Sequence, residues 1–218
     1  MKKHLLLFAL LIAGLSSFGQ SEKYIKAMEK LVPAIDTTRN PAALNDLANS
    51  FQRIADAEKN QWLPYYYAAL ANVSSAYMSM GEGQTASADK IDPVAEKAEG
   101  LLQKAEALSA NNSEIFCLKK MIGTLKLMAD PMNRYMTYGP AAAEALATAK
   151  KLNPENPRVY LLEGQDKFYT PEQFGGSKEE AKKLFQAAMA KYDSYKPESS
   201  IHPSWGKGQA AYFINLAQ

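Results

Sequence analysis

A short pattern recurs four times along this 218-residue chain: a small residue, a large apolar residue four positions later, and an alanine three positions after that. The four sets are Ser50/Ile54/Ala57, Ala98/Leu102/Ala105, Ala142/Leu146/Ala149 and Ala181/Phe185/Ala188. Offsets of four and three place the members of a set on one stripe of an α-helix, and the small members mark where a neighbouring helix approaches closely. The pattern therefore predicts repeated helical hairpins, an architecture that serves binding more often than catalysis.

Helix signals are dense and alternating β-branched runs are missing, so the sequence predicts an all-α fold. Five prolines follow residues that can cap a helix, and we expect helices to start at Asn40-Pro41, Asp92-Pro93, Asp130-Pro131, Asn156-Pro157 and Thr170-Pro171. Ser177 and Glu180 match a capping box, and Pro33 should break or kink the first helix. The predicted helices cover residues 22–36, 41–59, 62–80, 92–109, 113–129, 140–152, 157–168, 178–195 and 204–217.

The partner helices carry a second pattern. Leu70, Val73, Tyr77 and Gly81 have the order and spacing of the first half of a tetratricopeptide (TPR) repeat, and the Ala142 set followed by Pro154 has that of the second half. The chain thus resembles the TPR family, which implies a TPR-like α-solenoid of about four antiparallel helical hairpins plus a terminal capping helix. Its repeats are separated by 48, 44 and 39 residues. A regular TPR repeat has about 34, so long connections are expected at 81–89, 130–139 and 169–176.

Four further segments resemble signature blocks of small exported TPR-like proteins of the Bacteroidota, namely residues 62–67, 152–158, 168–176 and 203–206. This resemblance covers nearly the whole chain after its first residues. It implies export and the helical-repeat fold. It transfers no catalytic residue.

The amino terminus has the layout of a cleavable signal peptide. Lys2 and Lys3 precede an apolar run over residues 5–15, and Ser17 and Gly19 provide the small residues of a cleavage site. We expect residues 1–19 to be removed and residues 20–218 to form a single domain that starts at Gln20 and is periplasmic or secreted. The apolar run is too short for a membrane span.

The net charge and the single cysteine limit the classes of function that the sequence allows. Without Lys2 and Lys3, basic and acidic residues are equal in number, so the chain lacks the basic excess that nucleic-acid binding requires. Cys117 is the only cysteine and lies in an apolar stretch, which predicts a buried, unreactive thiol.

The inventory of chemically active residues is poor, and we predict no enzyme, no cofactor and no metal site. His202 is the only histidine outside the signal peptide, and no zinc, P-loop, GxGxxG or GxSxG pattern is present. The acidic residues Glu82, Asp89 and Asp92 lack the spacing of a calcium loop, and Asp92 is explained as a helix cap. Residues 174–176 predict a turn at positive φ, with Phe174 plugging the hairpin.

The sequence predicts an exported, non-enzymatic protein-interaction or scaffold module that binds a protein or peptide. Its groove is expected along the first helices of the hairpins, at 62–77, 114–126 and 158–168. Candidate groove residues are Trp62, Tyr66, Lys119, Lys126, Tyr160 and Gln165. The alternative is a small-molecule or glycan-binding component that works with an outer-membrane transporter. A pocket flanked by Trp and Tyr would favour the alternative, and an open groove would favour a protein partner.

Overall fold

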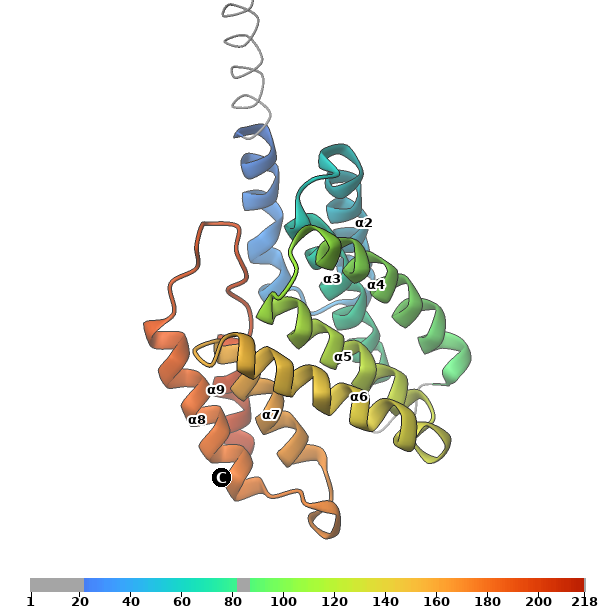
Figure 1. Cartoon of the computed structure of the whole chain (residues 1–218), viewed down its shortest axis with the longest axis vertical. Helices are drawn as coiled ribbons and strands as arrows, with labels where there is room; N and C mark the ends of the chain where they lie inside the picture. Colours follow the sequence, from blue (N-terminus) through green and yellow to red (C-terminus); the bar gives the residue numbers. More distant parts are fainter. Residues whose placement is uncertain (1–21, 82–86, 218) are drawn as a thin grey trace, which may run out of the picture.

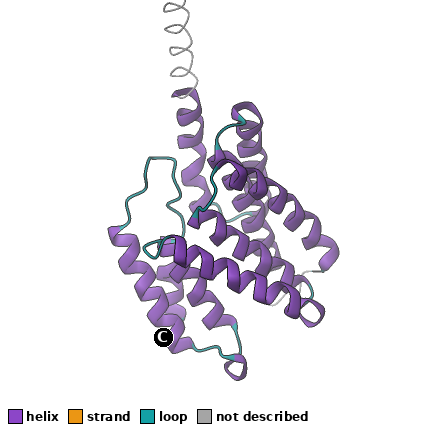
Figure 2. Ribbon diagram, viewed as in Figure 1, coloured by secondary structure: helices purple, strands orange, loops and turns teal. Residues whose placement is uncertain are grey.

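The computed structural model describes residues 22–81 and 87–217, and every regular element in them is helical (Figures 1 and 2). The elements are an N-terminal helix over residues 22–37, α2 (Pro41–Glu58), α3 (Trp62–Met80), α4 (Ala88–Leu108), α5 (Ser113–Ala129), α6 (Pro131–Leu152), α7 (Pro157–Tyr169), the short 3-10 helix η1 (Glu172–Phe174), α8 (Lys178–Ser194) and α9 (Lys207–Leu216). The predicted signal peptide and the predicted first residue Gln20 lie outside the described residues.

Consecutive helices pack against each other, and α3, α5 and α7 lie side by side as the inner row of the stack (Figure 1). The outer helices α4, α6 and α8 carry three of the four repeats, and in each repeat all three residues are buried. Ala105, Ala149 and Ala188 have no exposed surface, which confirms the predicted close approach of helices there.

The repeat in α2 is the exception. Ala57 is exposed and Ser50 is half-buried, whereas Leu44, Ala48, Phe51 and Ala55 form the buried stripe of this helix. The predicted buried stripe is therefore wrong in α2, where the buried face lies roughly a third of a turn away from it. The Phe51 ring stacks on Tyr67 of α3 at 5.1 Å between centroids, and this contact orients the helix.

Two helices begin earlier than predicted. Helix α4 starts at Ala88, so Asp92 is not its cap, and Pro93 lies inside it. Helix α6 starts at Pro131, with the Asp130 side chain accepting a hydrogen bond from the Asn133 amide, which confirms the helix start predicted at Asp130-Pro131. The predicted connection over residues 130–139 is wrong, because residues 131–139 are helical. In the amino-terminal helix, Pro33 also fails to end the helix, which runs on to residue 37.

The connection between α7 and α8 is held by backbone geometry. Gly175 has φ +92°, as predicted for this turn, and a Cβ on Gly176 would collide with the carbonyl oxygen of Thr170. Phe174 is 73 % exposed, so the prediction that it plugs the hairpin is wrong. Ser177 caps α8 as predicted, by accepting from the Glu180 amide at 3.2 Å, but the Glu180 carboxylate pairs with Lys167 instead of completing the capping box.

The loop over residues 195–206 returns to the beginning of the chain. Ser200 Oγ donates a hydrogen bond to Glu29 at 2.6 Å, and the Gly206 amide donates to Asp36 at 3.1 Å. Tyr67 Oη of α3 donates to the Ile201 carbonyl at 3.0 Å. These bonds join the last part of the described chain to its first helix.

Cys117 of α5 is fully buried, as predicted, and burial raises the pKa of its thiol. Among the described helices, none has both the length and the hydrophobicity needed to cross a bilayer.

Candidate functional site

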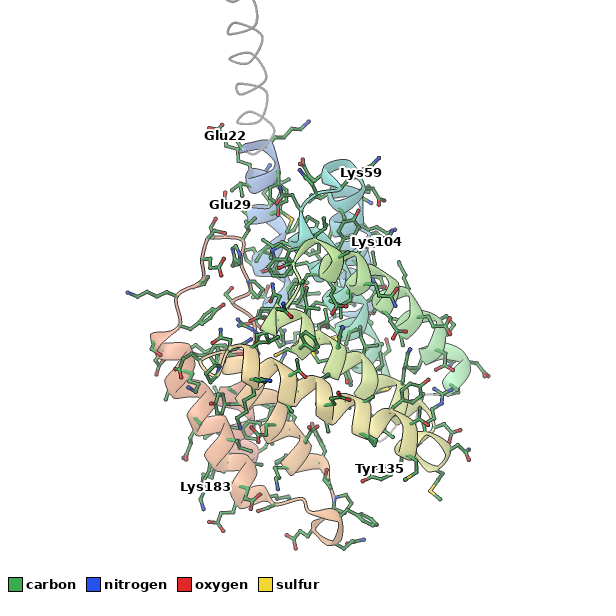
Figure 3. All side chains as sticks on the ribbon, in the orientation of Figure 1. Glu22, Glu29, Lys59, Lys104, Tyr135 and Lys183 are labelled. Atoms are coloured by element: carbon green, nitrogen blue, oxygen red, sulfur yellow. The ribbon has the colours of Figure 1, made fainter. Side chains whose placement is uncertain are left out.

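The first half of α6 displays large apolar side chains to solvent. Met132 is 92 % exposed, Met136 81 % and Tyr135 61 %. Their spacing of three and four residues puts them on one face of the helix, together with Gly139 one turn further on. We call Met132, Tyr135, Met136 and Gly139 the α6 platform. Figure 3 shows Tyr135 projecting from α6 into open space.

Gly139 has no side chain, and a Cβ there would lie 3.6 Å from Tyr135 Cδ2, so the Tyr135 ring lies beside the glycine on the α6 platform. Met132 and Met136 lie on the same face of the helix as this ring. Exposed apolar patches of this kind in soluble proteins mark binding sites, and methionine adapts its shape to the bound surface.

The opposite face of the same helical segment is held rigidly. Arg134 makes two hydrogen bonds to the Asp92 carboxylate, at 2.6 and 2.7 Å, and a third to the carbonyl oxygen of Lys126 at 3.2 Å. The bonds from Arg134 hold the pKa of the Asp92 carboxyl below its usual range, so this pair stays ionised at neutral pH. The ion pair ties α6 to the start of α4 and presents the platform in a fixed orientation.

A second candidate lies on another part of the molecule. A hollow of about 280 Å³ opens between the α4–α5 turn and the loop over residues 195–206. We call it the Trp62 hollow. Its lining includes Trp62, Asn111, Asn112, Asn153, Tyr195 and His202.

Beneath the Trp62 hollow lies a buried ion pair. Glu114 of α5 accepts two hydrogen bonds from Arg158 of α7, both at 2.7 Å, and one from the Asn156 side chain at 2.7 Å. Arg158 also donates to the carbonyl oxygens of Pro203 and Trp205, at 3.0 and 3.3 Å. These bonds from Arg158 hold the loop over residues 195–206 in place.

His202 lies at the edge of the Trp62 hollow with both ring nitrogens engaged. Nδ1 is 2.8 Å from Ser199 Oγ, and Nε2 is 3.2 Å from the Glu198 carboxylate. The imidazole meets Trp62 edge to face, at 6.0 Å between centroids. Within the described residues, no group of three or more His, Cys, Asp or Glu side chains is placed to hold a metal ion.

The residues predicted for the groove are not gathered in one place. Trp62 is half-buried and lines the hollow, whereas Tyr66 is fully buried and donates to Glu114. Tyr160 donates to the carbonyl oxygen of Pro154, and Gln165 is half-buried on α7. The two lysines form ion pairs at 2.6 Å, Lys119 with Glu106 and Lys126 with Glu99.

The expected groove along the inner helices has no room to form at α3, because most of this helix is buried between its neighbours. The α6 platform was missed because residues 131–139 were assigned to a loop. The sequence did contain the signal. Asp130-Pro131 is a helix start, and the residues of the platform then follow at helical spacing.

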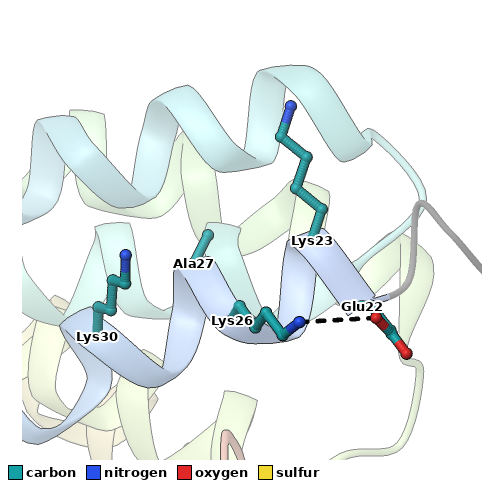
Figure 4. Close-up of a pocket in the computed structure, with 5 residues that line it drawn as sticks. All are labelled: Glu22, Lys23, Lys26, Ala27 and Lys30. Atoms are coloured by element: carbon teal, nitrogen blue, oxygen red, sulfur yellow. Dashed lines mark ion pairs between the residues drawn. The ribbon is translucent and has the colours of Figure 1, made fainter.

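A third hollow, of about 440 Å³, lies along the N-terminal helix and is lined by Glu22, Lys23, Lys26, Ala27 and Lys30 (Figure 4). Lys26 pairs with Glu22 at 3.6 Å, and both side chains are mostly exposed. The described lining residues all come from one face of a single helix, so the described part of the chain gives this hollow no second wall against which a ligand could bind.

No protein-family model matches the sequence, and no curated protein matches it. Among solved structures, the chain is similar to the HusA haemophore from Porphyromonas gingivalis, with 34 % identity and a TM-score of 0.77. The match covers 89 % of this chain and 92 % of the haemophore chain. The chain belongs to the same family as this haemophore. The relationship confirms the all-helical fold and the similarity to a Bacteroidota protein. Membership of the TPR family stays a resemblance.

Proposed function

We propose that the chain is an exported, non-enzymatic binding protein for haem or a closely related tetrapyrrole, and that the α6 platform is its binding surface. Two findings support the proposal: the family relationship to a haemophore, and the exposed apolar face of α6. The relationship to a haemophore favours the small-molecule alternative over the protein-interaction or scaffold module that the sequence predicted.

The chemistry of the α6 platform suits a flat macrocycle. A tetrapyrrole presents two broad apolar faces, and the Tyr135 ring beside Gly139 offers a surface on which such a face can stack. Met132 and Met136 can add contacts to the same face of the macrocycle, because thioether side chains are flexible and polarisable. Methionine sulfur and tyrosine oxygen are also ligands of haem iron in proteins.

The proposal is tested by titrating haem, and separately metal-free protoporphyrin, into the full chain without its signal peptide. We expect a saturable change in the Soret absorption band with one ligand or both. Comparing the two ligands separates contacts to the macrocycle from ligation of the iron. If neither ligand gives saturable binding, the proposed function is wrong.

The site is tested by Tyr135→Ala and by the double variant Met132→Ser/Met136→Ser. Each should weaken tetrapyrrole binding about tenfold or more, since exposed aromatic anchors dominate binding surfaces. All three side chains are exposed, so far-ultraviolet circular dichroism should stay unchanged.

The matched control is Tyr212→Ala, which removes an exposed tyrosine of α9 that is 53 % accessible. It should bind like the parent protein. Parent-like binding by both platform variants would place the tetrapyrrole site elsewhere on the molecule.

Export is tested by the intact mass of the protein recovered outside the cytoplasm. The small residues Ser17 and Gly19 predict a mature chain that begins at Gln20. A recovered protein that retains residues 1–19 would contradict this prediction.

A further inference from the structure

We infer that the Trp62 hollow is a second binding site, which takes one or two rings of a neutral saccharide. It is separate from the α6 platform, so this inference does not depend on tetrapyrrole binding. Three features of the hollow carry it: its charge, its aromatic walls and its amide groups.

The charges around the hollow exclude an ionic ligand. Neither Lys nor Arg lines it. Both carboxylate oxygens of Glu114 already accept hydrogen bonds, from Arg158, Asn156 and Tyr66. Glu198 is paired with His202. An anion would find neither Lys nor Arg among the described residues that line the hollow, and a cation would have to compete with Arg158 for Glu114.

The aromatic groups suit the apolar face of a sugar ring. Trp62 is half-buried, so part of its indole faces the hollow, and Tyr195 lies on the lining as well. Tyr195 is held by Arg158, whose guanidinium carbon lies 4.8 Å from the centre of the tyrosine ring. Tryptophan and tyrosine provide large contact areas at a low cost in conformational entropy.

The amide groups suit the hydroxyls of a sugar. Among the described residues, the side-chain amide of Asn111 has no hydrogen-bond partner, and the Asn153 side chain uses only its oxygen, which accepts from the Glu155 amide at 3.0 Å. Amides of this kind both donate and accept, as neutral hydroxyl groups require. Both side chains are exposed, so their amides can reach the hydroxyl groups of a bound sugar.

The volume of the Trp62 hollow limits the size of the ligand. Pockets for drug-sized ligands span about 300–1,000 Å³, and the Trp62 hollow, at about 280 Å³, lies just below that range. A tetrapyrrole is too large for it, whereas one or two pyranose rings are not. The walls are already in place, because Arg158 fixes the loop over residues 195–206 from below.

The test is isothermal titration calorimetry of the full mature chain with maltose and, separately, with N,N′-diacetylchitobiose. The two probes distinguish an unmodified hexose from an N-acetylated sugar as the ligand that the hollow binds. We expect saturable binding of at least one probe, with a dissociation constant of about 1 mM or lower. If neither probe binds, the inference is overturned.

Two variants locate the binding. Trp62→Ala should abolish it, and Asn111→Gly should weaken it about threefold to tenfold. Asn111 has φ +57°, a conformation that glycine adopts freely, so Asn111→Gly removes the amide without straining the turn. It therefore keeps the test valid if Trp62→Ala fails to fold. Sugar binding that is unchanged in Asn111→Gly would overturn the inference, whether or not Trp62→Ala folds, and so would unchanged binding in a folded Trp62→Ala.

A matched control separates this site from the α6 platform. Tyr135→Ala should bind the sugar like the parent protein, and Asn111→Gly should bind haem like the parent protein. Loss of sugar binding in Tyr135→Ala would overturn the claim of two separate sites. If the tetrapyrrole titration shows no binding, the sugar titration still tests this inference, because the two sites are separate.

Discussion

At the scale of residues, the Glu114–Arg158 pair is the most consequential contact of the core. Arg158 has no exposed side-chain surface, and the side chain of Glu114 is 11 % exposed. Glu114 and Arg158 each stand two residues after the asparagine that caps their helix, Asn112 and Asn156, so they occupy equivalent positions in successive hairpins. That correspondence is visible in the sequence, but that the two side chains pair is decided only by the stacking of α5 and α7.

Glu114→Gln should lower the free energy of unfolding by about 3–5 kcal/mol, since it leaves the buried charge of Arg158 uncompensated. Urea denaturation followed by circular dichroism measures the change. The control is Glu179→Gln, which breaks an exposed pair with Lys183 and should change stability by no more than about 0.5 kcal/mol. Equal effects of the two variants would show that the buried pair contributes nothing beyond a surface pair.

At the scale of elements, the small residues of the outer helices set how closely the hairpins pack. Ala149→Leu should overpack α6 against its neighbours and cost about 1–3 kcal/mol, because Ala149 is fully buried. Ala147→Leu, at an exposed position on the same helix, is the control and should leave the melting temperature nearly unchanged. Equal melting temperatures of Ala149→Leu and the parent protein would contradict the packing described for α6.

The sequence predicted where most helices lie because caps, prolines and spacing are local signals. It failed at α4 and α6 because proline was taken to mark the first turn only. Pro93 lies near the start of α4, and the hydrogen bond that Pro140 removes would have ended on the carbonyl oxygen of Met136, on the exposed face of α6 where water replaces it. The Trp62 hollow was unpredictable for a different reason, since its walls come from residues more than 130 positions apart.

At the scale of the whole molecule, the α6 platform and the Trp62 hollow lie on one helical stack, with the hydrogen bonds of Arg134 behind the first and those of Arg158 behind the second. A protein whose binding surfaces are already formed before the ligand arrives loses little conformational entropy on binding. This arrangement suits a carrier that must take up its ligand without a large rearrangement.

The bonds from the loop over residues 195–206 to Glu29 and Asp36 also bear on how the protein comes apart. Stacks of helical repeats contact only their neighbours, so they can unzip from either end. Here the loop that follows the last repeat, residues 195–206, is bonded to the first described helix. Opening the stack at its last hairpin therefore also breaks contacts of that first helix.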